Sequence, residues 1–218
     1  MRLVVFDVDG TLIDSQSHIH RSMTKAFEGA GLPPLPKARV LSIVGLSLPV
    51  AVAELVPDLD PATRDRIVKG YKQAFMAARK ESPAPLYDGA RECLDLLGAR
   101  DDLMLAVATG KSRRGLDAMI EAHGLQNRFL SLQTADGHPS KPHPAMLMAA
   151  MSECGADADR TAMIGDTSFD MQMARGAGAT GIGVAWGYHD SDLLRQAGAA
   201  RIAPDFAQLE RIIGEWAA

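Results

Sequence analysis

Short apolar runs alternate with helical patterns along most of the chain. Four runs have the length and composition of buried strands: LVVF (3–6), MLAVA (104–108), TAMI (161–164) and GIGVA (181–185). Each is followed by a segment whose apolar positions recur at helical spacing. Strands that alternate with helices in this way are typical of a parallel sheet covered by helices. The pattern therefore predicts an α/β fold.

Two of the predicted helices have an especially regular apolar stripe. The first ends at Gly98, a residue type that commonly terminates helices, and its stripe comprises Ala90, Cys93, Leu94 and Leu97. The second follows Asp205, a residue type that caps helices, and its stripe comprises Phe206, Leu209, Ile213 and Trp216. Both stripes predict helices that pack one face on the sheet.

Residues 15–83 follow a different pattern. This stretch has no convincing strand. It contains a long helical pattern whose apolar face comprises Ile67, Tyr71, Phe75 and Ala78. The segment GLPPLPK (31–37) breaks helices inside it, and SPAPLYDG (82–89) marks the return to the main pattern. We therefore predict a helical insert at 15–83 within a main domain made of residues 1–14 and 84–218.

The composition is that of an ordinary globular protein. Of 218 residues, 47% are hydrophobic and 23% charged, and the net charge of −4 gives no reason to expect a nucleic-acid partner. The two cysteines lack metal-ligand or disulfide spacing, and no apolar run has the length of a secretory signal or a membrane span. We therefore expect a cytoplasmic protein without a membrane partner, either a monomer or a homodimer.

Polar residues follow the predicted strands. Asp7 and Asp9 come after the first strand, Thr109 after the second, and Asp166 after TAMIG, while Lys141 follows FLSLQTADGHPS (129–140). Ligands of parallel α/β sheets bind beyond the carboxyl ends of the strands. We therefore expect these five side chains to converge on one site.

The two first acids require a compensating positive charge. Asp7 and Asp9 are two residues apart, so an extended chain would point both carboxylates to the same side, where they repel each other. Two cations can offset this charge: the ammonium group of Lys141, and a metal ion attracted by Asp7 together with Asp166. Mg²⁺ prefers an all-oxygen set of ligands. The sequence therefore predicts Mg²⁺ as cofactor.

Asp170 is the fourth acid of the predicted site. It lies four residues after Asp166, on one face of the turn where Thr167 or Ser168 would begin a helix. We predict that Asp170 holds the metal or supports its ligands. The alternative is a first-turn acid favoured only by the helix dipole.

Other residues provide contacts for an oxyanion. Gly10 lets the loop after Asp9 turn tightly and leaves amide groups free, and Thr109 offers a hydroxyl just before Gly110, at a second expected helix start. These groups and Lys141 would hold the phosphoryl oxygens of the substrate. In the cap segment VGLSLPVA, Gly45, Leu46 and Ser47 either contact the leaving group or form a plain helix-start turn.

Together these groups fit phosphoryl transfer through a covalent aspartyl phosphate. Asp7 would attack phosphorus, and Asp9 would give a proton to the departing alkoxide and later take one from the attacking water. Thr109 and Lys141 would stabilise the charge that spreads over the phosphoryl oxygens. A small phosphorylated metabolite is the expected substrate.

The motifs DVDGTLIDS, VATG, KPHP and MIGDTSFDMQMARGAG resemble, in order, the four motifs of haloacid dehalogenase-like phosphatases. The chain is most similar to the phosphoglycolate phosphatase-like branch. This resemblance implies a Rossmann-like three-layer core and a small helical cap after the first strand. It also implies Mg²⁺ held by Asp7, Asp166 and the carbonyl of Asp9, and a small ester such as phosphoglycolate as substrate. Relatives often carry Asn where this chain has Gly110.

Three alternatives use similar residues. A dehalogenase needs neither the second acid Asp9 nor a divalent metal. A sugar phosphomutase shares the core but holds its sugar with cap residues, and VGLSLPVA offers no obvious basic clamp. A receiver-type signalling domain has its motifs in a different order. Another phosphate-binding protein without turnover would bind phosphate but not release it from an ester. The histidines His18 and His20 are expected to be solvent-exposed helix positions.

Overall fold

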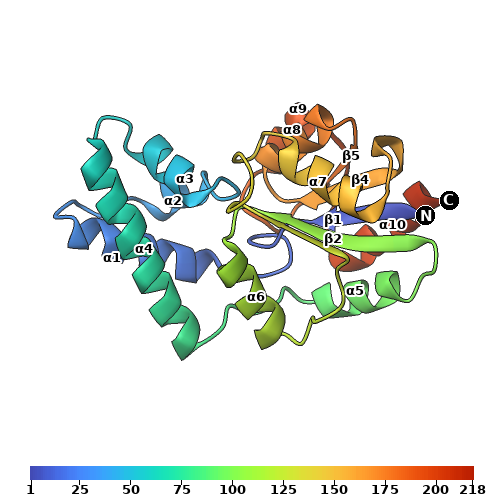
Figure 1. Ribbon diagram of the computed structural model, residues 1–218, viewed down its shortest axis with the longest axis horizontal. Coiled ribbons are helices and arrows are strands. Elements are labelled where there is room, and N and C mark those ends of the chain that lie inside the picture. The colour runs from blue at the N-terminus through green and yellow to red at the C-terminus, as the bar shows by residue number, and fades with distance from the viewer.

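The computed structural model describes residues 1–218 and contains one sheet of six parallel strands. The strand order is β3-β2-β1-β4-β5-β6, so β1 lies in the centre and β4 pairs with it on the side away from β2 (Figure 1). The strands are β1 (Arg2–Phe6), β2 (Leu103–Thr109), β3 (Ser131–Thr134), β4 (Thr161–Gly165), β5 (Thr180–Val184) and β6 (Ala199–Ala203). The predicted parallel sheet is confirmed.

Two of these strands, β3 and β6, were not among the four runs that the apolar pattern identified. Both lie at the edges of the sheet. Edge strands pair on one side only, and β6 leaves Ala200 and Arg201 exposed to solvent. The exposure of β6 explains why it needs no continuous apolar run, whereas β3 lacks the signal because its buried residues Ser131, Gln133 and Thr134 are polar.

Helices cover both faces of the sheet and form the expected three layers. One face carries α5 (Ala90–Gly98), α6 (Arg113–Ala122) and α10 (Phe206–Ala217), and the other carries α7 (Ala145–Cys154), α8 (Ser168–Gly176) and α9 (Ser191–Ala197) (Figure 1). A short 3₁₀ turn, η1 (Ala158–Arg160), precedes β4. This Rossmann-like architecture confirms the predicted fold class.

The predicted stripes are buried against the sheet. The apolar stripe of α5 belongs to the largest apolar cluster, together with the side chains of β1 and β2 that point toward this helix. In α10 the carboxylate of Asp205 accepts a hydrogen bond of 2.8 Å from the backbone N–H of Gln208, as expected for a helix cap. Trp216 is only partly buried and packs against the edge of the same cluster.

Residues between β1 and α5 form a separate group of helices, called the cap below. The cap contains α1 (Gln16–Gly29), α2 (Lys37–Leu41), α3 (Leu48–Leu55) and α4 (Pro61–Glu81), and no strand. Its helices share their own apolar cluster, which includes Met23, Phe27, Val52 and Ile67. The division of the chain at residues 15 and 83 stays a prediction.

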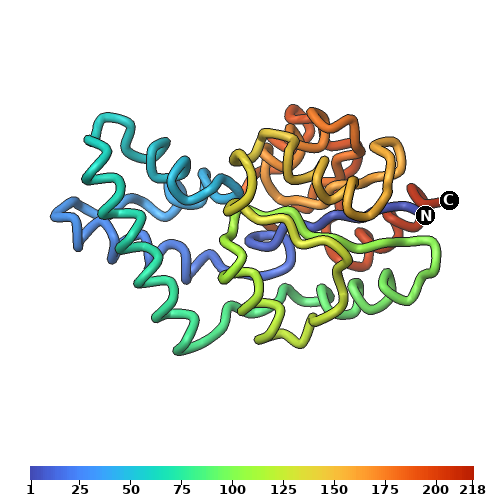
Figure 2. The backbone as a smooth tube through the Cα atoms, in the orientation of Figure 1, coloured from blue at the N-terminus to red at the C-terminus, as the bar shows by residue number.

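The chain crosses between the cap and the core twice, and the two crossings are hydrogen-bonded to each other (Figure 2). The N–H of Asp14 donates to the carbonyl of Pro85 at 2.9 Å, and the N–H of Tyr87 donates to that of Leu12 at 3.0 Å. In addition, Nε2 of His18 lies 2.8 Å from the carbonyl oxygen of Ser82. His18 is therefore buried, which corrects the expectation that it is exposed.

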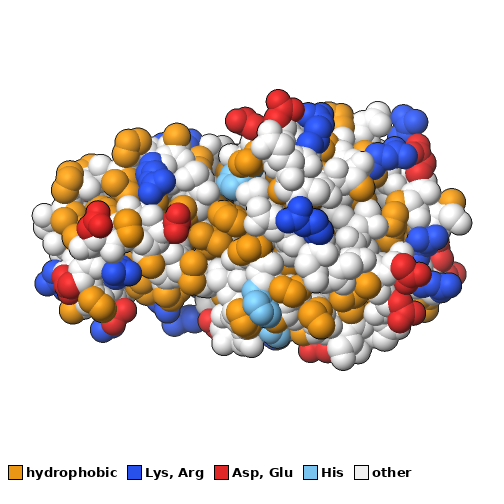
Figure 3. Space-filling view, turned by 90° about the horizontal axis from the view of Figure 1, so that it is seen from above, with side chains coloured by type: hydrophobic (Ala, Val, Ile, Leu, Met, Phe, Trp, Pro, Cys, Tyr) orange, Lys and Arg blue, Asp and Glu red, His pale blue; other side chains and the backbone are white.

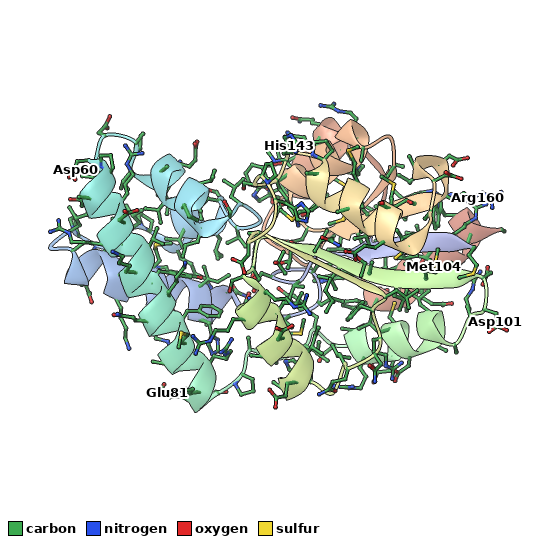
Figure 4. The ribbon with its side chains drawn as sticks, viewed as in Figure 1. Asp60, Glu81, Asp101, Met104, His143 and Arg160 are labelled. Atoms are coloured by element: carbon green, nitrogen blue, oxygen red, sulfur yellow. The ribbon has the colours of Figure 1, made fainter.

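The carboxyl ends of the strands face the cap. Asp101 and Arg160, which precede β2 and β4, lie at the opposite end of the strands, away from the cap (Figure 4). Asp60 and Glu81 mark the two ends of α4 in the cap. Residues that follow the strands thus lie between the core and the cap. Among the helices, none combines the length and apolar character that a membrane crossing requires.

Candidate active site

Asp7, Lys141 and Asp170 form a buried charged row beyond the end of β1. Asp7 is 1% exposed, and its N–H donates to the carbonyl of Ile164 at 2.9 Å, which ties it to the neighbouring strand β4. The ammonium nitrogen of Lys141 lies 3.0 Å from Oδ1 of Asp7 and 2.6 Å from Oδ1 of Asp170. Neither carboxylate oxygen of Asp7 accepts a well-aligned hydrogen bond. A buried carboxylate without such bonds is one that a cation would stabilise.

The pKa values reflect this burial. Burial raises the pKa of Asp7 to about 6, against the opposing effect of Lys141, and the neighbouring Asp170 and Asp9 raise it further. Burial likewise raises the pKa of Asp166, to which Asp170 and Asp7 also contribute. Burial alone would lower the pKa of Lys141, but the carboxylates of Asp170 and Asp7 raise it to about 12, so Lys141 is a cation at neutral pH. One lysine therefore offsets a cluster of three acids only in part.

Asp166 follows β4 and faces Asp7. Its Oδ1 accepts a hydrogen bond of 2.8 Å from the Thr11 hydroxyl, and its Oδ2 accepts one of 2.9 Å from the N–H of Tyr188. Gly10, with φ of +85°, lies against it: a Cβ at this position would be 2.2 Å from Oδ2 of Asp166. Only a glycine lets the loop pass this close, as the sequence predicted for a tight turn after Asp9.

Both carboxylate oxygens of Asp170 accept hydrogen bonds. Its Oδ1 accepts from Lys141, while its Oδ2 accepts from the N–H of Thr167 at 3.1 Å and from the Thr167 hydroxyl at 2.6 Å. Thr167 in turn caps α8 in a capping box with Asp170, as expected for a helix that begins at this turn. Asp170 thus joins the start of α8 to the ammonium group that touches Asp7.

The three acids are close enough to share one metal ion. Asp7, Asp166 and Asp170 each offer a carboxylate oxygen, and these three oxygens lie within 4.8 Å of one another. The set is buried, made only of oxygens, and carries more negative charge than Lys141 balances. These properties fit a hard divalent cation such as Mg²⁺.

Asp9 has a partner that the sequence reasoning missed. The ammonium nitrogen of Lys111 lies 2.6 Å from both carboxylate oxygens of Asp9, and the Ser15 hydroxyl donates to Oδ1 at 2.5 Å. The same nitrogen lies 5.0 Å from the ring centroid of Phe75 on α4 of the cap. Lys111 lies two residues beyond Thr109, at the end of β2, a position that indicates closeness to the site but does not identify Asp9 as its partner.

Thr109 and Gly110 lie at the end of β2, beside the cap. The helix that follows, α6, begins at Arg113 with Ser112 as its cap, so the expectation of a helix start at Gly110 is wrong by three residues. A Cβ on Gly110 would lie 2.7 Å from the carbonyl oxygen of Gly45 and 2.8 Å from that of Leu46. The cap loop thus occupies the space that an asparagine side chain would need.

The cap loop 42–47 is held to the core by further bonds. The N–H of Ser47 donates to the Ser140 hydroxyl at 2.8 Å, next to Lys141. Nε2 of His189 lies 3.1 Å from the carbonyl oxygen of Ser42, and its Nδ1 accepts from the N–H of Ser168 at 3.1 Å. Burial lowers the pKa of His189, which agrees with a neutral ring whose Nδ1 is an acceptor.

A cavity of about 400 Å³ lies between the cap and the core. The core contributes Asp7, Asp9, Thr109 and Gly110 to its lining, and Gly45 and Leu46 line it from the cap. Lys141, Asp166 and Asp170 lie behind Asp7 and do not line this cavity. On one face of the molecule, hydrophobic side chains are present along the junction of cap and core (Figure 3). The site thus has an open side toward the cap and a closed, charged side toward the core.

Comparisons with known proteins agree with this fold. The family model described as haloacid dehalogenase-like hydrolase matches residues 4–184. A protein named probable phosphatase IndB, from Dickeya dadantii, is 36% identical over 213 residues, which cover 95% of this chain and 91% of that protein. A phosphoglycolate phosphatase from Chromobacterium violaceum is 33% identical over 200 residues, 89% of each chain.

Solved structures share the whole architecture. The crystal structure of a hydrolase from Pseudomonas syringae has a TM-score of 0.88 with 27% identity and covers 99% of both chains. A predicted phosphatase from Clostridium acetobutylicum has a TM-score of 0.88 with 26% identity and covers 98% of both. The chain belongs to the haloacid dehalogenase-like hydrolase family, and the resemblance seen in its motifs is confirmed.

Proposed function

We propose that the protein is a Mg²⁺-dependent phosphatase that hydrolyses small organic phosphate monoesters through an aspartyl phosphate on Asp7. The observation that carries this proposal is Asp7 itself. Its carboxylate is buried, lacks well-aligned hydrogen bonds, lies beside Lys141 and Asp166, and borders a cavity. The relatives named phosphatases support the same reaction class.

The residues that would hold Mg²⁺ are Asp7, Asp166 and the backbone carbonyl of Asp9, with Asp170 in support. When bound, the ion would offset the repulsion between the Asp7 carboxylate and the phosphate and polarise the phosphoryl group. Because both oxygens of Asp170 are already engaged by Lys141 and Thr167, we assign Asp170 mainly to positioning Lys141.

In the first step, a carboxylate oxygen of Asp7 forms a bond to phosphorus while the bond from phosphorus to the ester oxygen breaks. Thr109 and Lys141 hold the phosphoryl oxygens, and Asp9 gives its proton to the departing alkoxide. In the second step, a water molecule attacks the same phosphorus and gives a proton to Asp9. Inorganic phosphate leaves, and the Asp7 carboxylate is restored.

Asp9 must carry a proton in the first step, although Lys111 now pairs with its carboxylate at 2.6 Å. The ion pair therefore corresponds to the enzyme before the substrate binds, or after Asp9 has given its proton to the departing alkoxide. We propose that the phosphate of an arriving substrate competes for the ammonium group of Lys111 and so frees Asp9 to hold a proton.

We place the protein in the cytoplasm, in agreement with its two free cysteines, and take a small phosphorylated metabolite as its partner. Phosphoglycolate is one candidate, because several relatives have that name. A sugar phosphomutase of the same fold remains the competing function. Isomerised hexose phosphate without net phosphate release would favour the mutase.

The decisive assay measures phosphate release from a panel of monoesters with Mg²⁺ and with chelator. The wild type should turn over at least one ester many times and lose activity with chelator. Asp7→Asn should abolish turnover, because an amide is not a nucleophile at phosphorus. Asp101→Asn, an exposed acid at the far edge of the sheet, is the matched control and should keep full activity. Undiminished turnover by Asp7→Asn would end the proposal.

A further inference from the structure

The cavity beside Asp7 is larger than a two-carbon substrate needs. Its volume of about 400 Å³ lies in the range of sites that bury drug-sized ligands. Phosphoglycolate has only two carbon atoms beyond its phosphate. If the phosphate sits at Asp7 and Thr109, most of the remaining volume lies toward the cap, where the leaving group of the ester would be.

The wall on the cap side is apolar and partly aromatic. The cap residues with apolar side chains that line the cavity include Ile19, Met23, Leu48, Tyr71, Phe75 and Met76. The rings of Tyr71 and Phe75 are stacked on α4, with centroids 5.6 Å apart and planes inclined by 21°. Burial raises the pKa of Tyr71, so its side chain stays neutral. Such a surface favours a flat or bulky apolar group.

Four cations also line the cavity: Lys72 and Arg79 on α4 of the cap, and Lys111 and Arg114 from the core. Lys111 pairs with Asp9, and Nη1 of Arg79 donates to the carbonyl of Arg114 at 3.4 Å. Lys72 and Arg114 are exposed to solvent. A carboxylate packed on Tyr71 and Met76 would lose its hydration there and would have to compete for cations that already have partners or are hydrated, which is costly.

We infer, on the basis of the proposed phosphatase function, that the substrate is the phosphate ester of an alcohol with a ring-sized apolar or aromatic body. In this arrangement the phosphate lies at Asp7, and the body of the leaving group packs on Tyr71, Phe75 and Met76. A small acidic ester such as phosphoglycolate leaves that surface uncovered and is a poor substrate.

The test compares three esters of primary alcohols: benzyl phosphate, ethyl phosphate and phosphoglycolate. We expect kcat/KM for benzyl phosphate to exceed that for ethyl phosphate by about tenfold or more, as burial of a phenyl-sized face would give. Phosphoglycolate should be no better than ethyl phosphate. If phosphoglycolate is instead the best of the three, the inference is overturned while the proposed phosphatase function stands.

Three variants assign the preference to the cap wall. Met76→Lys places a cation in the wall and should lower the ratio of benzyl to ethyl phosphate about tenfold while raising kcat/KM for phosphoglycolate. Met76→Leu keeps the wall apolar and should keep the wild-type order. Met148→Lys adds the same charge on α7, where Met148 is 54% exposed and outside the cavity, and should change none of the ratios.

The remaining outcomes are also decisive. Equal ratios in Met76→Lys and the wild type would show that the leaving group does not contact this wall, and would overturn the inference. Hydrolysis of none of these three esters, while the wider panel gives phosphate release from another ester, would overturn the inference and leave the proposed function standing. Since all variants are compared by ratios between substrates, a partial loss of folded enzyme does not affect the result.

Discussion

The ammonium nitrogen of Lys111 lies 2.6 Å from both carboxylate oxygens of Asp9. Asp9 is the residue to which we assign both proton transfers, and Lys111 also faces the ring of Phe75 in the cap. This lysine therefore connects the acid and base that we propose for the reaction to the cap.

Replacement of Lys111 by methionine tests this connection. The variant keeps an unbranched side chain of similar length but lacks the charge that we expect to attract the phosphate of the substrate. We expect kcat/KM to fall about tenfold or more, measured by phosphate release. Lys111→Arg, which keeps the charge, should retain most of the activity. Equal activity of Lys111→Met and the wild type would contradict this role.

The burial of Asp7 predicts a pH-dependent stability of the metal-free protein. Its pKa is raised from an ordinary value of 3.8 to about 6 in the folded state. The folded protein thus binds this proton more tightly than the unfolded chain. The free energy of unfolding should fall as pH rises from about 4 to about 6, and the loss should persist above pH 6.

Asp7→Asn removes this titration. We expect the metal-free variant to be more stable than the wild type by about 1–3 kcal/mol at pH 7.5 and to differ little at pH 4. Mg²⁺ should raise the Tm of the wild type at pH 7.5 and have little effect on the variant. Thermal unfolding measured across pH, with and without Mg²⁺, provides the comparison; equal pH dependence in both proteins would contradict the prediction.

Gly110 should tolerate no side chain while the cap is closed. A Cβ there would lie 2.7 Å from the Gly45 carbonyl oxygen, so Gly110→Ala must displace the cap loop. We expect kcat/KM to fall by about tenfold or more and the stability to fall by about 1–3 kcal/mol. Gly137→Ala, at a loop position with open space around it, is the control and should behave as the wild type.

The pair of Lys141 and Asp170 should contribute strongly to stability because it is completely buried. Asp170→Asn leaves the Lys141 ammonium group with less compensation and disturbs the cap of α8. We expect a loss of about 3 kcal/mol, measured by chemical unfolding. The control is Asp117→Asn, which breaks the exposed pair with Arg113 and should change the stability by less than about 1 kcal/mol. Equal losses would contradict this difference between buried and exposed pairs.

The central strands and the acids that follow them were predictable from the sequence. β1, β2, β4 and β5 are buried on both faces, which requires continuous apolar runs, and an acid at the end of such a run is conspicuous. Asp7 and Asp166 therefore stand out, and the structure brings them together with Lys141 and Asp170. Their assigned roles stay predictions until the variants are measured.

The remaining features depend on contacts between distant segments. Lys111 pairs with Asp9 only because the ends of β1 and β2 are neighbours, and a lysine after a strand has no local signal for such a partner. His18 is buried because Ser82, 64 residues later, returns to the same place. The closeness of Gly110 to the cap loop likewise arises only when the cap docks on the core.

The cap enters and leaves the core at one point, where Asp14 bonds to Pro85 and Tyr87 bonds to Leu12. An insertion whose two ends are hydrogen-bonded to each other can be replaced by another insertion without a shift of the core strands that precede and follow it. Relatives that share the core can therefore diverge in what they recognise while the reacting acids stay fixed. A chimaera that takes residues 15–83 from another member of the family should inherit the donor's substrate range and keep this chain's chemistry.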